Sequence, residues 1–130
     1  MDEQDRTFES LLAVARRLTE CLMAGDVAGV EALYHEDVVT WRNLDGRELV
    51  KRQMLKIVSF LADAVADLKY SELRVQPTPT GYVQQHVLHG VARSGETVAA
   101  ATCMVVEVRE GRIVRVDEYM DSAAMAPLMG

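Results

Sequence analysis

The chain has 130 residues, enough for one domain with its own core; 49% are apolar and 26% charged, as in an ordinary globular protein. Its formal charge of −6 argues against nucleic-acid binding, which needs clustered Lys and Arg side chains. No apolar run approaches the roughly 20 residues that cross a bilayer. The acidic start lacks the basic and apolar regions of a signal peptide. We therefore expect a cytoplasmic protein with a single domain, residues 1–130, in which Cys21 and Cys103 are reduced and buried.

The first third of the chain has helical periodicity. Apolar residues recur at the spacing of one helical face, namely Phe8, Leu11, Leu12, Ala15, Leu18 and Leu22. Gly25 then suits the C-terminal end of this helix, and Asp26 suits the N-cap of the next one. The second helix is short, and residues 35–37 end it.

A short strand and a third helix are predicted next. Residues 38–43 are β-branched and then aromatic, which favours a strand. Asp45 and Glu48 have the spacing of a capping box, so a helix should start there. Apolar residues at helical spacing carry this helix to about Asp67.

From Tyr70 onwards the period changes to two, which predicts four strands separated by turns. The strands cover residues 71–75, 82–92, 97–108 and 112–121. The element order α-α-β-α-β-β-β-β predicts an α+β fold with an antiparallel sheet. Residues 98–104 are small or apolar on both faces. Helices can cover one face, and a second subunit is the simplest cover for the other, so we expect a homodimer through the outer sheet face.

The last strand is unusually acidic. Asp117, Glu118, Tyr119 and Asp121 fall within five residues. Burying a carboxylate without a partner is costly, so these side chains either face water or line a pocket. Tyr119 and Asp121 share one face of a regular strand, as does Asp117 if no bulge intervenes. Glu118, like Glu107, is assigned no role.

The element order resembles that of the SnoaL-like branch of the nuclear transport factor 2-like superfamily. The resemblance rests on AGD at 24–26, LYHEDVV at 33–39, GRI at 111–113 and EYMD at 118–121, and spans about Phe8 to Leu128. It implies a cone of helices and curved sheet around a mostly apolar pocket, usually in a homodimer. The superfamily includes polyketide cyclases, ketosteroid isomerases, limonene epoxide hydrolases, dehydratases and non-enzymatic binding proteins, so the fold alone does not define the function.

The epoxide hydrolases give the most informative comparison. Their aromatic-x-Asn segment, in which the Asn helps to hold the attacking water, resembles Trp41-Arg42-Asn43. Their Tyr-x-Asp resembles Tyr119-Met120-Asp121. Their Arg-x-Asp pair has no counterpart, because the corresponding strand reads Gln84-Gln85-His86-Val87. Depending on the register of this strand, Gln85 and Val87 or Gln84 and His86 would take the places of that pair.

The other relatives match differently. The isomerase base falls at Arg42 or Asn43, its tyrosine at Leu18, and its protonated Asp near Cys103 or Met104, so we reject isomerase activity of that type. The SnoaL-type cyclases rely chiefly on one pocket carboxylate. The resemblance gives that role to Asp121.

We therefore expect binding of a small apolar molecule, with acid/base catalysis of the cyclase, isomerase or hydrolase type by Asp121. Asn43, with Gln85 or His86, would orient water or a substrate oxygen. The remaining substrate-binding residues are Trp41, Tyr119, Leu18 and Met104. No cofactor, metal, nucleic acid or membrane is expected; His86 and His89 have opposite parity on their strand and cannot share a metal. The alternative is a non-catalytic ligand-binding or structural homodimer.

Overall fold

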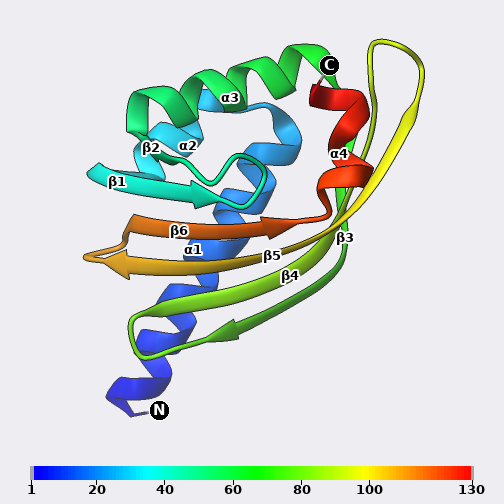
Figure 1. Cartoon of the computed structure of the whole chain (residues 1–130). Coiled ribbons are helices and arrows are strands. Elements are labelled where there is room, and N and C mark those ends of the chain that lie inside the picture. Colours follow the sequence, from blue (N-terminus) through cyan, green and yellow to red (C-terminus); the bar gives the residue numbers. More distant parts are fainter. Residues whose placement is uncertain (1, 130) are drawn as a thin grey trace.

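The computed structural model describes residues 2–129 and has four helices and a six-stranded sheet in this part of the chain (Figure 1). The helices are α1 (Glu3–Ala24), α2 (Val27–Leu33), α3 (Lys51–Ala64) and α4 (Ser122–Met129). The strands are β1 (Tyr34–Arg42), β2 (Glu48–Val50), β3 (Ala66–Pro77), β4 (Gly81–Val91), β5 (Thr97–Arg109) and β6 (Arg112–Met120). The predicted α+β fold is confirmed.

The junction between α1 and α2 forms as the sequence predicts. Gly25 ends α1 in the left-handed conformation, with φ of 67°, which costs glycine little. Asp26 caps α2 by accepting the Gly29 backbone N–H at 2.9 Å. A sharp change of direction is thus set by two adjacent residues.

The segment between β1 and α3 differs from the predicted helix start. Asp45 accepts from Arg42 Nη2 at 2.9 Å and from the Arg47 backbone N–H at 3.1 Å, so it caps no helix. The following residues form β2, which pairs with β1. Helix α3 begins only after β2, where the Gln53 side chain accepts the Val50 backbone N–H at 3.0 Å. The apparent capping box is therefore a turn held by Arg42.

The sheet has the strand order β2-β1-β6-β5-β4-β3. Within residues 2–129 its strands pair antiparallel except for β1 and β6, which are parallel. Strand β3 contains two register shifts, and Asp67 and Glu72, which lie within them, both have φ of 54°. Such bulges bend a strand and increase its twist. In Figure 1 strands β3, β4 and β5 accordingly bend upward at the right-hand side, beside α4.

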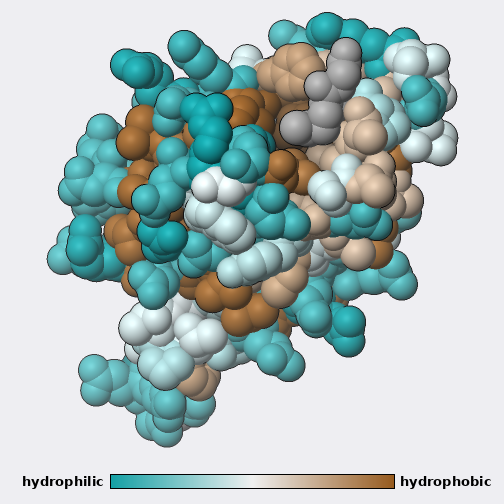
Figure 2. Space-filling model, viewed as in Figure 1, coloured by the Kyte–Doolittle hydropathy of each residue, from teal (hydrophilic) through white to brown (hydrophobic). Residues whose placement is uncertain are grey.

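Within residues 2–129 the helices pack on one face of the sheet, here called the inner face. Side chains along β5 alternate between burial, as at Ala100 and Met104, and exposure, as at Ala101 and Val105. The exposed set belongs to the outer face. Hydrophilic residues cover much of the surface seen in Figure 2, with apolar patches between them.

Two clusters of buried apolar side chains lie on the inner face. The larger joins α1, α2 and α3 to the sheet through residues such as Leu18 and Ile113. The smaller joins α4 to the sheet through Met125, Leu88 and Met120. Among the described residues, no helix is both long enough and apolar enough to span a membrane.

Candidate functional site

A cavity of about 290 Å³, here called the inner pocket, lies between the two apolar clusters. Leu18 of α1 and Met54 of α3 form part of its wall, and Met104 of β5 lies on the sheet side. Met125 and Leu128 of α4 also line it. A mostly apolar, concave site of this kind suits a small organic molecule, and the methionines can adapt to its shape.

Five polar side chains interrupt this apolar lining: Tyr34, Thr40, Arg42, Tyr70 and Glu118. Arg42 and Glu118 are register partners in the parallel β1–β6 pair, and Thr40 precedes Arg42 by two residues on the same face. Strand pairing therefore brings a guanidinium, a hydroxyl and a carboxyl group together on the sheet side of the inner pocket.

Glu118 is the carboxyl group of the inner pocket. Burial raises the pKa of Glu118 above its ordinary value, while the positive charge of Arg42 acts in the opposite direction. No salt bridge to its carboxylate forms within residues 2–129. A carboxyl group in such surroundings keeps its proton to a higher pH and is suited to proton transfer.

Tyr34 and Tyr70 supply two phenol groups to the same pocket. Burial raises the pKa of Tyr34 and of Tyr70, and the charge of Glu118 raises both further. Both phenols therefore remain protonated and can donate a hydrogen bond at any physiological pH. Tyr34, Tyr70 and Glu118 therefore supply two hydroxyl groups and one carboxyl group to the lining of the same pocket.

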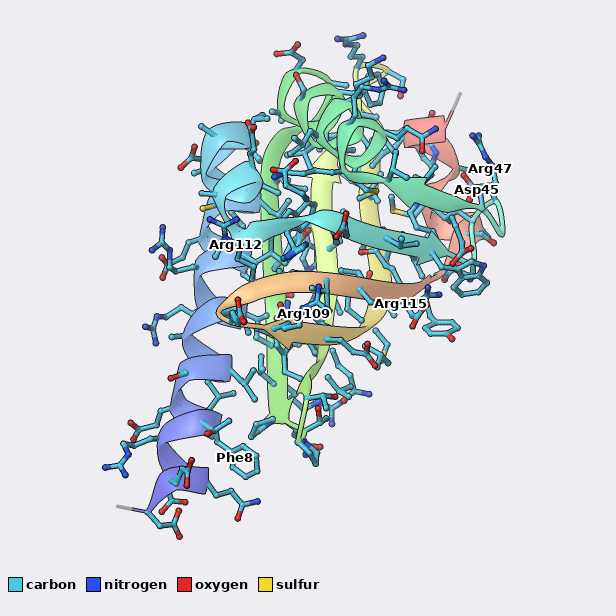
Figure 3. The ribbon with its side chains drawn as sticks, turned by 90° about the vertical axis from the view of Figure 1, so that its left-hand side faces the viewer. Phe8, Asp45, Arg47, Arg109, Arg112 and Arg115 are labelled. Carbon is cyan, nitrogen blue, oxygen red and sulfur yellow. The ribbon has the colours of Figure 1, made fainter. Side chains whose placement is uncertain are left out.

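The Arg42 guanidinium has one paired nitrogen, Nη2, and one unpaired nitrogen, Nε, among the described residues. Its Nη2 binds Asp45 Oδ2 at 2.9 Å, while its Nε is buried without a hydrogen-bond partner among the described residues. Thr40 Oγ1 is likewise buried and unpartnered. Burial opposes ionisation of Asp45, but the Arg47 N–H and the Arg42 guanidinium outweigh it and lower the pKa of Asp45. Figure 3 places Asp45 and Arg47 on the loop that follows β1.

A second set of polar side chains, centred on Gln84 and His86 of β4, lies next to the inner pocket residue Tyr70. Gln84 Nε2 lies 3.1 Å from both Thr19 Oγ1 and His86 Nδ1. The His86 ring stacks on Tyr70, with 4.1 Å between ring centroids. Burial lowers the pKa of His86 to about 4, so the ring is neutral at pH 7. An amide that donates to Nδ1 leaves the ring proton on Nε2, which is buried without a partner in the described chain.

The structure places Asp121 and Asn43 away from the inner pocket, contrary to the expected arrangement. Asp121 is exposed and accepts the Ala124 backbone N–H at 3.2 Å, at the start of α4. Asn43 Nδ2 donates to Met120 O at 3.0 Å, and its Oδ1 accepts from Met120 N at 2.9 Å. Strand β6 ends at Met120, so its alternation does not extend to Asp121. Asn43 instead joins the segment after β1 to the end of β6, and Asp121 caps the start of α4.

The remaining expected residues divide between the two faces. Trp41 and Tyr119 pack together on the outer face with 5.2 Å between ring centroids, and Gln85 is exposed on the same face. His86 faces inward and contacts the pocket residue Tyr70. The last two, Leu18 and Met104, lie in the pocket lining.

The sequence interpretation assigned no role to Glu118, which lines the inner pocket. Its signal is present in the strand, because Val116 and Met120 are apolar, are buried, and have the same parity as Glu118. Assigning the inner face of β6 from these two residues places Glu118, rather than Asp121, in the pocket.

Comparison with solved structures defines the class of fold. An NTF2-like protein from Burkholderia xenovorans superposes with a TM-score of 0.76 at 16% identity, covering 92% of this chain and 95% of that one. An LEH-like epoxide hydrolase from M. tuberculosis gives a TM-score of 0.76 at 18% identity, with coverages of 95% and 92%. A candidate polyketide cyclase from Xanthomonas campestris gives 0.78 at 20% identity, with coverages of 87% and 91%. These likenesses establish an NTF2-like fold.

The family follows from the sequence. The profile of the SnoaL-like domain matches residues 15–116, which is most of the chain. The chain therefore belongs to the SnoaL-like family, as its motifs predicted. No curated protein matches it in sequence.

Proposed function

We propose that this protein binds a small, largely apolar organic molecule in the inner pocket and transfers a proton to or from it through Glu118. The observation that carries the proposal is the position of Glu118: a carboxyl group with no salt-bridge partner in the described chain, with a raised pKa, in the lining of a mostly apolar cavity. Burying such a group costs stability, and acid/base catalysis is a use that offsets this cost.

The neighbouring groups support this chemistry. Tyr34 and Tyr70 can donate hydrogen bonds to a substrate oxygen, or to the Glu118 carboxylate once it has lost its proton. The mostly apolar walls lower the local dielectric constant, which strengthens these interactions. Glu118 would act as the general acid or base, while the two phenols stabilise the charge that develops during proton transfer.

The test begins with mass spectrometry of small molecules that the purified protein retains, followed by turnover assays on them. Glu118→Gln keeps the shape of the side chain and removes its titration. We expect turnover to fall about 10²–10⁴-fold, with ligand affinity little changed. Asp117→Asn is the matched control, because Asp117 is the preceding residue on β6, lies on the outer face, and should leave turnover unchanged. Unchanged turnover in Glu118→Gln would show that this role is wrong.

A non-catalytic ligand-binding function is the second candidate. It is favoured by Asn43 and Asp121, whose hydrogen bonds serve the backbone instead of a substrate or water. An assay of the wild-type protein distinguishes the two functions. A retained ligand that is never converted supports binding alone, and conversion of the ligand supports catalysis.

We also propose that a second copy of the chain covers the outer face. Leu73, Val105 and Tyr119 are 45%, 39% and 48% exposed there, and an open groove of about 580 Å³ runs between β3 and β6. Exposed apolar surface of this kind is typical of an interface, and a two-fold dimer would bury it symmetrically. Sedimentation equilibrium at micromolar concentration tests this: we expect a dimer that Val105→Glu dissociates, and a wild-type monomer would contradict the proposal.

A further inference from the structure

Thr40 and Arg42 are polar pocket residues that the proposed proton transfer does not use. The Thr40 side chain is almost fully enclosed, and its Oγ1 has no hydrogen-bond partner among residues 2–129. The Nε–H of Arg42 is equally enclosed and unpartnered in that part of the chain, although its Nη2 binds Asp45. Leaving a buried polar atom without a hydrogen bond is unfavourable for folding. Two such donors on one face of β1, both lining the inner pocket, call for an acceptor that the described residues do not supply.

We propose that Thr40 Oγ1–H and Arg42 Nε–H form a subsite that binds a carbonyl oxygen of the ligand. The inference rests on the proposed function, because it requires an organic molecule in the inner pocket. Both groups donate hydrogen bonds, and a carbonyl oxygen has two lone pairs to accept them. Register pairing of Arg42 with Glu118 sets this oxygen close to the proton-transfer group.

The charges around the subsite favour a neutral carbonyl over a carboxylate. Asp45 already neutralises the Arg42 guanidinium through its 2.9 Å ion pair. Glu118 shares the pocket, and once ionised it would repel a second carboxylate. The ligand class is therefore an apolar ketone, aldehyde or ester that carries its carbonyl group toward β1.

Three naphthalenes of closely similar shape test the subsite: 2-acetylnaphthalene, its alkene isostere 2-isopropenylnaphthalene, and 2-naphthoate. We expect the wild-type protein to bind the ketone roughly tenfold more tightly than the alkene, and more tightly than the carboxylate, by calorimetry. The carbonyl stretching band of the bound ketone should shift to lower frequency, as a hydrogen bond to its oxygen requires.

Thr40→Val removes the hydroxyl with little change of shape. We expect it to reduce the ketone preference about fivefold, to leave alkene affinity unchanged and to leave the melting temperature equal or higher, because an unpaired buried hydroxyl is lost. Thr102→Val is the matched control: Thr102 is buried on β5 outside the pocket lining, and its hydroxyl donates to Ala100 O. This control should keep the ketone preference.

The outcomes distinguish this inference from the proposed function. If the alkene binds as tightly as the ketone, or if Thr40→Val keeps the preference, the carbonyl subsite is wrong while the inner pocket and Glu118 stand. If none of the three naphthalenes binds the wild-type protein, both the subsite and the ligand-binding pocket are overturned.

Discussion

On β6, the adjacent residues Asp117 and Glu118 point to opposite faces of the sheet and have opposite surroundings. Asp117 lies on the outer face and accepts from Arg115 Nη2 at 3.0 Å, while Arg115 Nη1 also binds Glu48 at 2.9 Å. Glu118 lies on the inner face, where no described side chain forms a salt bridge with it and burial raises its pKa. The outer-face carboxylate is thus paired with an arginine, whereas the inner-face carboxyl group forms no salt bridge among the described residues.

Unpaired polar atoms also occur elsewhere on the inner face of the sheet. The buried side-chain atoms without a partner, within the described residues, include Thr40 Oγ1 on β1 and Gln84 Oε1 and His86 Nε2 on β4, all from inward-facing residues. A protein selected only for stability would pair these atoms or replace them with apolar groups. Of these residues Thr40 lines the inner pocket, where a ligand can complete its hydrogen bonding.

His86 should give the largest effect on stability. Its pKa of about 4 in the folded protein lies below its ordinary value of 6.5, so only the unfolded chain takes up a proton between these values. Stability is therefore lost as the pH falls from 6.5 toward 4, by up to about 3 kcal/mol. His86→Phe keeps a ring against Tyr70 and should remove this loss, as measured by urea unfolding at a series of pH values.

His89 provides the matched control for this experiment. It lies on the same strand but on the outer face, where its Nε2 is 2.7 Å from Ser71 Oγ. The pH-dependent difference between wild type and His86→Phe should exceed that for His89→Phe. Parallel stability curves for wild type and His86→Phe between pH 6.5 and 4 would contradict the assignment of a buried, neutral His86.

Glu118 should show the opposite dependence on pH. Its pKa in the folded protein lies above the ordinary value of 4.5, so the folded state holds this proton more tightly than the unfolded state does. Its contribution to stability is therefore complete below pH 4.5 and declines as the pH rises through the raised pKa. Glu118→Gln should gain stability relative to wild type between pH 4.5 and neutrality, by urea unfolding. A difference that stays constant with pH would show that Glu118 does not titrate with a raised pKa.

The fold was predictable from the sequence because its signals are local and repeated. The helical face of residues 8–22 and the period of two beyond Tyr70 define the elements, and Gly25 with Asp26 defines a junction. The error at Asp45 has a specific cause. Its carboxylate binds Arg42 and the Arg47 N–H, a competition that the spacing of a capping box does not reveal.

The site was less predictable because it depends on which face each strand residue occupies. The expected pair Tyr119 and Asp121 share a parity, but Tyr119 faces outward and Asp121 lies beyond the end of β6. The apolar Val116 and Met120 mark the inner face and would have identified Glu118. On β4, mixed residues on both faces left open whether Gln85 or His86 faces inward, and only pairing with β3 and β5 decides it. That information is not contained in a single strand.

Asp117→Asn should give the smallest effect and sharpens the contrast between the two faces. Asp117 is partly exposed, and Arg115 retains Glu48 as a partner in the variant. We expect the free energy of unfolding to fall by at most about 1 kcal/mol, because exposed ion pairs contribute little to stability. The decrease should be smaller at high salt, because salt screens the charges. Urea unfolding in low and high sodium chloride measures both. A loss that is as large as the pH effect of His86 and insensitive to salt would mean that the outer face is itself buried, as a tightly associated dimer would require.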